Sequence, residues 1–297
     1  MNKMTFDQKR TTRYLSWTFL IAWIMQAVVT VLYHSGLTVV GQLVMAVMMF
    51  TPLLGVLLAG SKLPGIGWKP RLKGNARFLL AAWFLPALLT AVGALLYFAV
   101  FPGHFDLSGA YLAATAGPEV LEQLAAQGLT YPMTVLISVV ACLTYAPLVN
   151  TLLAVGEEVG WRGLLYPQLK ARFGKGKGLM IGGLIWSVWH WPLIWLIGYE
   201  YGTDYVGFPV VGMLIFCIFA TAAGVVCDWL YEKSGSIWFP SIFHGAINAA
   251  ATLPALLCIT KTGSTVLLGP APIGVLAGLP LALFAMVLLF KSNSKQS

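Results

Sequence analysis

The sequence predicts an all-α polytopic membrane protein, a bundle of about eight transmembrane helices with both termini on the cytoplasmic side. Two observations carry this prediction: the composition of the chain and the placement of its charges. Hydrophobic residues make up 59% of the 297 residues, charged residues only 9%, and the mean hydropathy is +0.82. A soluble protein of this length needs far more charge to cover its surface, so the composition excludes that class.

Apolar runs long enough to cross a bilayer define the expected helices. They lie at roughly 14–33, 37–59, 78–101, 132–157, 179–199, 208–231, 236–258 and 266–290. Prolines interrupt the last two runs, at positions Pro254, Pro270, Pro272 and Pro280. The runs lack the period-two alternation of a membrane β-strand, so each is predicted to be a helix. We interpret residues 1–297 as a single integral membrane domain.

The basic residues divide sharply between the two sides of the predicted bundle. With the N-terminus inside, the cytoplasmic segments are 1–13, 60–77, 158–178, 232–235 and 291–297. They hold 17 of the 18 Lys and Arg residues, and only Lys261 falls in an outer loop. This is the positive-inside pattern of multi-pass proteins, and it explains the net charge of +8 without a nucleic-acid partner. The chain is therefore expected in the cell membrane, surrounded by the lipid bilayer.

Three ionisable residues are predicted to lie at similar depth inside the membrane. We take Pro167 as the inner end of the helix that carries Glu157, and Glu157 then lies about 15 Å from that end. His190 lies about 17 Å, and His244 about 12 Å, from the inner ends of their own runs. Each costs roughly 2.5–3.5 kcal/mol to insert, so such residues are functional candidates. A lone histidine is more often a tether between helices, but polar groups brought to one level by three helices indicate a shared site. Asp228, near the inner end of its run, is expected to be a solvated helix end.

Helical spacing assigns these polar residues to faces. His244 and Asn248 are four residues apart and share one face. Glu158 and Arg162 are also four apart, in the orientation that favours a salt bridge. Glu157 points about 100° away from Glu158, so the two carboxylates have different surroundings. We expect the Glu158–Arg162 pair to fix the helix and Glu157 to face a cavity.

A carboxylate and two histidines in a secluded polar pocket suit the activation of water by general-base catalysis. A pair of donors on a neighbouring helix could hold the oxyanion of a tetrahedral intermediate. The sequence has no H-E-x-x-H, no G-x-S-G and no G-x-G-D. These absences exclude the zincin, serine and aspartyl arrangements of intramembrane proteases.

Three ordered motifs resemble those of the CPBP family, the CAAX-prenyl endopeptidases of the second type and their bacterial Abi-like relatives. The motifs are Glu157-Glu158-x-x-x-Arg162, an aromatic residue four positions before His190, and His244-x-x-x-Asn248. One departure is Trp186, which stands where the family usually has Phe. The motifs define a protease core region at about 132–258.

The resemblance implies an intramembrane endopeptidase, a hydrolase that cleaves a membrane-associated or lipidated protein or peptide. By the resemblance, Glu157 with His190 activates the water, and His244 with Asn248 forms the oxyanion site. By the same resemblance, Glu158 and Arg162 support these four residues. The site is expected in the cytoplasmic half of the bilayer.

The resemblance leaves metal dependence open, because family members are described both as metalloproteases and as metal-independent glutamate proteases. Glu157, His190 and His244 could form a two-histidine, one-carboxylate Zn²⁺ site with an open position. No second carboxylate is recognisable as the base beside such a metal. We therefore favour a mechanism without a cofactor and keep Zn²⁺ as the alternative.

A membrane transporter or proton-relay protein is the competing function, since buried carboxylates and histidines also mark ion paths. Paired half-helices and inverted repeats would indicate a transporter, and the sequence shows neither. A non-catalytic descendant of proteases is expected to have lost Glu157 or His190, and both are present.

Overall fold

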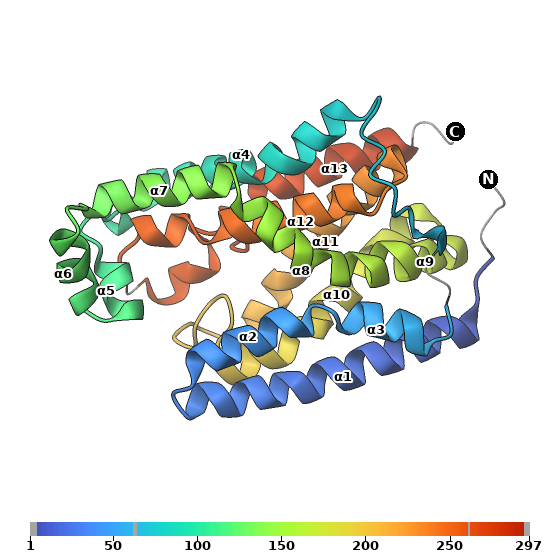
Figure 1. The fold of residues 1–297 in the computed structure, drawn as a ribbon, viewed down its shortest axis with the longest axis horizontal. Helices are drawn as coiled ribbons and strands as arrows, with labels where there is room; N and C mark the ends of the chain where they lie inside the picture. The colour runs from blue at the N-terminus through green and yellow to red at the C-terminus, as the bar shows by residue number, and fades with distance from the viewer. Residues whose placement is uncertain (1–4, 62–63, 261, 294–297) are drawn as a thin grey trace.

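A computed structural model describes residues 5–61, 64–260 and 262–293 of the chain as a bundle of helices (Figure 1). Within these residues the only β-pairing is an isolated bridge between Phe105 and Cys258. The predicted all-α fold class is confirmed. Of the charge pattern, Lys3, Lys62, Lys261 and Lys295 lie outside the described residues.

The N-terminal part of the bundle is a hairpin of α1 (Gln8–His34) with α2 (Thr38–Met48) and α3 (Thr51–Leu58). The chain bends at Met49 and Phe50, because Pro52 near the start of α3 lacks the N–H that a continuous helix would use. After the short 3₁₀ turn η1 (Pro64–Ile66), α4 (Ala76–Val100) crosses to the other end.

A cap of short elements follows α4. It contains η2 (Pro102–His104), α5 (Ala110–Ala116) and α6 (Glu119–Ala126). The sequence Glu119-Val-Leu-Glu122 after Pro118 begins α6, and the chain then bends by 85° into α7 (Tyr131–Leu143).

The helices that carry the predicted site form the centre of the bundle. They are α8 (Ala146–Gly160), the π-helical turn η3 (Trp161–Leu165), α9 (Tyr166–Phe173), α10 (Lys175–Ile197), α11 (Val210–Ser234) and α12 (Trp238–Ala251). α8 packs along α12, and α10 packs along α11. The 3₁₀ turns η4 (Pro254–Leu257) and η5 (Gly263–Leu267) then lead to α13 (Leu279–Asn293).

The structure does not reproduce eight full-length spanning helices. Five helices of the described residues are long and apolar enough to cross a membrane, or up to six if the bent pair α6 and α7 counts as one. The run 132–157 is split at Thr144 and Tyr145, and α12 has only 14 residues before Pro254. α13 has 15 residues because the chain segment with Pro270 and Pro272 is not helical. Prolines shorten these helices because they lack the N–H that a helix needs. The last two apolar runs, which prolines interrupt in the sequence, are among the shortened ones.

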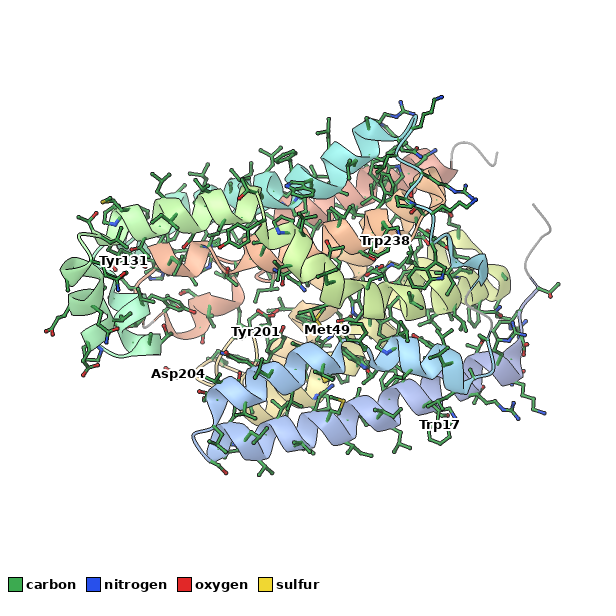
Figure 2. The ribbon with its side chains drawn as sticks, viewed as in Figure 1. Trp17, Met49, Tyr131, Tyr201, Asp204 and Trp238 are labelled. Atoms are coloured by element: carbon green, nitrogen blue, oxygen red, sulfur yellow. The ribbon has the colours of Figure 1, made fainter. Side chains whose placement is uncertain are left out.

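The outer surface of the bundle is apolar, as expected of a surface that faces lipid. Trp17 is 41% exposed and points away from the bundle (Figure 2), and Leu95 is 70% exposed. Together with the long apolar helices, this surface shows a multi-pass membrane protein. The start of α1, the end of α13 and the basic helix α9 lie at one end of the molecule, whereas α5 and α6 lie at the other (Figure 1).

Candidate active site

Both carboxylates of the predicted site lie at the buried end of α8. Glu157 is 2% exposed and Glu158 is fully buried. Gly156 and Gly160 let α8 approach the α2–α3 bend closely: a Cβ at Gly160 would lie 2.4 Å from Cβ of Pro52. Small residues at such contacts allow close helix packing in membranes. The backbone of α8 is thereby held at a defined distance from α3.

Glu157 accepts two hydrogen bonds from tryptophans on one of its oxygens. Trp161 Nε1 donates to Oε2 at 3.0 Å from one turn away, and Trp186 Nε1 of α10 donates at 2.8 Å. The other oxygen, Oε1, has no hydrogen bond to a described residue. The expectation that Glu157 faces a cavity stays a prediction. Two indole N–H groups lie against Oε2.

Glu158 pairs with Arg162, as its spacing predicts, and also with His244. Arg162 Nη1 lies 3.0 Å from Glu158 Oε1, and both side chains are fully buried. His244 Nδ1 lies 2.9 Å from the same oxygen. Glu158 therefore does more than fix its own helix, because it joins α8 to α12.

The guanidinium group of Arg162 is held by several partners besides Glu158. It lies 4.5 Å from the ring centroid of Tyr166 and 4.7 Å from that of Trp186. Its Nη2 donates to the carbonyl of Gly224 on α11 at 3.4 Å. A buried charge needs such compensation, so Arg162 ties α8, α10 and α11 together.

His190 lies one turn beyond Trp186 on α10 and is half-buried. Its Nδ1 is 3.0 Å from the carbonyl oxygen of Trp186. Because a carbonyl only accepts, Nδ1 carries the proton and Nε2 of a neutral ring is free to accept. The imidazole also interacts electrostatically with Glu157 and His244.

His244 and Asn248 lie on α12 with the spacing that the sequence predicts. The ring of His244 packs edge-on against Trp186 at 5.1 Å between centroids. Asn248 is half-buried one turn further along α12, and it makes no hydrogen bond to another described residue. The structure therefore gathers Glu157, Glu158, Arg162, His190 and His244 around Trp186, with Asn248 beside this cluster.

Among the described residues, no three His, Cys, Asp or Glu side chains are close enough together to hold a metal ion. The bonds that His190 and His244 make at Nδ1 leave Nε2 of each ring open, as in many metal-binding histidines. The alternative ligand set of Glu157, His190 and His244 is not assembled in this conformation, and no step below uses a metal.

Sequence reasoning missed the role of the tryptophans as donors to Glu157. Trp161 follows Glu157 by four residues, and this helical spacing is the signal available in the sequence. Asp228 was expected to be solvated, and that expectation is wrong: it is 1% exposed. Lys170 Nζ lies 2.6 Å and 2.8 Å from its two carboxylate oxygens. This ion pair joins α9 to α11. It lies one turn along α11 from Gly224, whose carbonyl accepts a hydrogen bond from Arg162.

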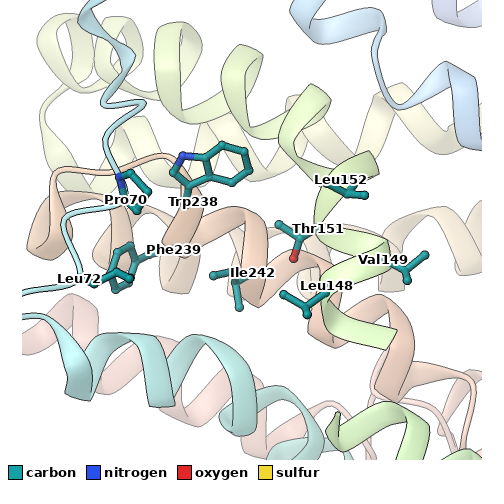
Figure 3. Close-up of a pocket in the computed structure, with 9 residues that line it drawn as sticks. All are labelled: Pro70, Leu72, Leu148, Val149, Thr151, Leu152, Trp238, Phe239 and Ile242. Carbon is teal, nitrogen blue, oxygen red and sulfur yellow. The ribbon is translucent and has the colours of Figure 1, made fainter. Parts of the chain in front are cut away.

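An apolar groove of about 370 Å³ lies beside the site, between α8, α12 and the segment around Pro70 and Leu72 (Figure 3). Thr151 is the single hydroxyl residue among those that line it, and its hydroxyl donates to the carbonyl of Pro147 at 2.6 Å. Ile242, two residues before His244, also lines the groove. The groove therefore offers an apolar surface next to the helices that carry the polar cluster.

Comparisons with known proteins agree with the motifs. Residues 133–250 match the family model described as type II CAAX prenyl endopeptidase, Rce1-like. The chain is also 32% identical over 111 residues to CAAX prenyl protease 2 of Methanococcus maripaludis, which is 37% of this chain and 41% of that relative. All six site residues named from the sequence lie between 133 and 250. Residues 133–250, the part of the chain that carries the ordered motifs, are therefore similar to the Rce1-like type II CAAX prenyl endopeptidases, and the chain spans less than half the length of the relative that it matches.

Proposed function

We propose that this protein is an intramembrane endopeptidase that hydrolyses a peptide bond of a membrane-associated substrate with a water activated by Glu157. The observation that carries the proposal is the buried cluster on α8, α10 and α12, in which one tryptophan joins Glu157 to His244. The family match favours this function over the transporter alternative.

Glu157 acts as the general base in this proposal. The two indole N–H groups donate to Oε2 and fix the orientation of the carboxylate. Oε1 is left to take the proton of the attacking water. The rigid indoles preorganise the base, which avoids reorganisation during the reaction.

His190 positions the water together with Glu157. With the proton on Nδ1, its Nε2 is available as an acceptor for a water hydrogen. The carbonyl of Trp186 fixes this tautomer, as a backbone carbonyl often does for a catalytic histidine.

His244 and Asn248 stabilise the oxyanion. Nδ1 of His244 donates to the Glu158 carboxylate, which fixes the ring, and an N–H at Nε2 would be the donor to the oxyanion. Asn248, on the same face of α12, supplies the second donor through its side-chain amide. Glu158 and Arg162 act as positioning residues for His244.

The substrate class follows from the relative and from the groove. The relative from Methanococcus maripaludis is a CAAX prenyl protease, and we extend to this chain only a lipid-modified, membrane-associated substrate. An apolar groove beside α8 and α12 suits a substrate that approaches from the lipid. The site would open toward the cytoplasmic half of the membrane.

The test is turnover by the purified protein in liposomes, with lipidated and unlipidated forms of one peptide library. The Glu157→Gln variant keeps the shape of the side chain and removes the base, so it should fold and cleave nothing. Metal analysis of the same preparations, with turnover after chelation, decides between the metal-free mechanism and Zn²⁺. Wild-type turnover by Glu157→Gln would overturn the assignment of the base.

A further inference from the structure

One face of α1 is polar and buried, although α1 spans the membrane. Tyr14, Thr18, Ala22 and Gln26 follow one another at four-residue spacing and are all fully buried. Residues at this spacing share one face of a helix. Buried polar groups are costly inside a membrane protein and are functional candidates. α1 lies outside residues 133–250, so the family match does not account for this face.

Several polar atoms on and around this face lack a close partner among the described residues. Gln26 Oε1, Thr51 Oγ1 on α3 and Trp189 Nε1 on α10 have none, and Tyr14 Oη and Thr18 Oγ1, one turn apart, have only each other. Gln26 uses only its amide nitrogen, which donates to the carbonyl of Trp189 at 2.7 Å. Buried polar atoms are nearly always paired, with protein or with ordered water. These incompletely paired atoms point to water molecules that pair them.

This interface lies close to the candidate base. A Cβ on Gly160 of α8 would lie 2.5 Å from the Tyr14 hydroxyl. The Tyr14 ring packs edge-on against Trp161 at 6.1 Å, and Trp161 donates to Glu157. One indole ring therefore connects the end of the polar face to the carboxylate.

The remaining walls come from α3 and α10. A Cβ on Gly55 of α3 would lie 2.0 Å from Thr18 Oγ1, so the Thr18 hydroxyl points at α3. Thr51 lies one turn before Gly55 on the same face. On the α10 side, Trp189 packs edge-on against Trp161 at 6.2 Å. The polar side chains thus come from α1, α3 and α10, and both α3 and α10 pack against α1.

We propose that Tyr14, Thr18, Thr51, Gln26 and Trp189 bind a row of ordered water molecules that supplies Glu157 with the water for hydrolysis. Each cleaved peptide bond consumes one water. Its oxygen bonds to the carbonyl carbon, the bond from that carbon to nitrogen breaks, one proton passes through Glu157 to the leaving amine, and the other stays with the new carboxyl group. The delivery of water to Glu157 rests on the proposed function. The presence of water in the interface does not depend on that function, and a separate experiment tests it.

The first experiment tests hydration by the reaction of single cysteines with Ag⁺, a small ion that reaches thiols only through water. The native residues Cys142, Cys217, Cys227 and Cys258 are first replaced. Thr18→Cys is compared with Leu20→Cys, which lies at nearly the same depth but is 53% exposed on the apolar outer face. We expect Thr18→Cys to react at least about tenfold faster than Leu20→Cys. Equal slow reaction of the two would overturn the proposal.

Hydroxyl-radical footprinting of the unmodified protein guards against a Thr18→Cys variant that does not fold. Radicals formed from bound water oxidise the side chains beside it. After correction for intrinsic reactivity, Tyr14 should be oxidised faster than Phe243, which is equally buried in the same core but carries no polar atom. Oxidation of Tyr14 no faster than that of Phe243 contradicts a hydrated interface.

Kinetics test the supply role. Thr18→Val removes a hydroxyl with little change of shape, and it should lower kcat about tenfold with KM unchanged, the effect of about one lost hydrogen bond. Thr18→Ser keeps the hydroxyl and should restore kcat. Unchanged kcat in Thr18→Val, with rapid Ag⁺ reaction, would leave a hydrated interface but overturn its role in supply. If the wild-type protein cleaves no peptide, the proposed function fails while the Ag⁺ result still decides hydration.

Discussion

Glu157 and Glu158 are neighbours in the chain but have different partners in the fold. Helical geometry predicts this difference, because adjacent residues point about 100° apart. It also predicts the Glu158–Arg162 pair, which lies within one helix. It could not predict that Trp186 donates to Glu157 or that His244 reaches Glu158, since these contacts depend on how α10 and α12 pack on α8. Spacing within a helix is readable from sequence, whereas the direction of a side chain across a helix interface is not.

Replacing each carboxylate by alanine should separate the two roles. Glu157→Ala should abolish cleavage and leave the protein folded, because the loss is that of the base and of hydrogen bonds to indoles. Glu158→Ala should also lower the stability in detergent, by about 3–5 kcal/mol, because Arg162 would stay buried and unpaired. Turnover and thermal unfolding in detergent measure the two effects, and the exposed Glu119→Ala on α6 serves as control. Unchanged stability of Glu158→Ala would show that the pair is not structural.

Trp186 departs from the Phe of related sequences, and it can be tested by restoring that residue. Trp186→Phe keeps an aromatic ring against His244 and Arg162 but removes the donor to Glu157. We expect a folded protein with kcat lowered about tenfold, the effect of about one lost hydrogen bond. Trp186→Ala, which also removes the ring from Arg162, should unfold at lower temperature. If Trp186→Phe turns over as fast as wild type, the indole donor is not needed to orient Glu157.

The histidines and Asn248 distinguish the metal-free mechanism from a zinc mechanism. Asn248→Ala should lower turnover by roughly a hundredfold or more, the usual loss for one oxyanion donor, and leave the metal content unchanged. In a zinc mechanism, His190→Ala or His244→Ala would instead empty a metal site, and activity would vanish with a chelator and return with zinc. The metal content and the turnover of each purified variant, measured together, distinguish the two mechanisms. One tightly bound zinc per chain, lost together with activity, would overturn the metal-free assignment and leave the protease assignment intact.

At the scale of helices, the sequence predicts the long spanning helices but not the breaks within the other apolar runs. Long, uninterrupted apolar runs predict α1, α4, α10 and α11 well, because hydropathy over a whole span is a strong signal. The same signal misses the break between α7 and α8 and the π-helical turn η3. The sequence suggested that the helix ends at Pro167, which lacks an N–H. The chain instead forms the π-helical turn η3 just before Pro167 and continues as α9 to Phe173. The sequence therefore predicts the apolar segments better than the interruptions within them.

Gly160 and Gly176 form a matched pair for testing the α8–α3 contact. A Cβ on Gly160 would lie 2.4 Å from Pro52 and 2.5 Å from the Tyr14 hydroxyl, whereas a Cβ on Gly176 meets nothing within 4 Å. Gly160→Ala should therefore destabilise the protein by about 1–3 kcal/mol through overpacking. Gly176→Ala, in the first turn of α10, should be neutral or stabilise it by up to about 1 kcal/mol through helix propensity. Thermal unfolding in detergent measures both, and equal stability of the two variants would contradict a tight α8–α3 contact.

At the scale of the molecule, the charges and the fold agree on which segments lie together. The start of α1, the segment before α4, α9 and the end of α13 gather at one end (Figure 1). These are the segments in which the sequence concentrates its basic residues. Hydropathy and charge suffice for this arrangement, because each segment is assigned to a side independently of how the helices pack. The number of complete crossings is harder to predict, since prolines divide or shorten the remaining apolar runs.

The side of the membrane that this end faces is the last prediction. The positive-inside rule places both termini and the loops 60–77 and 170–178 in the cytoplasm, because cytoplasmic loops retain Lys and Arg. After removal of the native cysteines, Lys175→Cys should react with a membrane-impermeant maleimide only when the cells are permeabilised. Gln127→Cys, exposed in the outer cap beyond α6, should react in intact cells. Ready labelling of position 175 from outside intact cells would reverse the orientation, and the candidate site would then lie in the outer half of the bilayer.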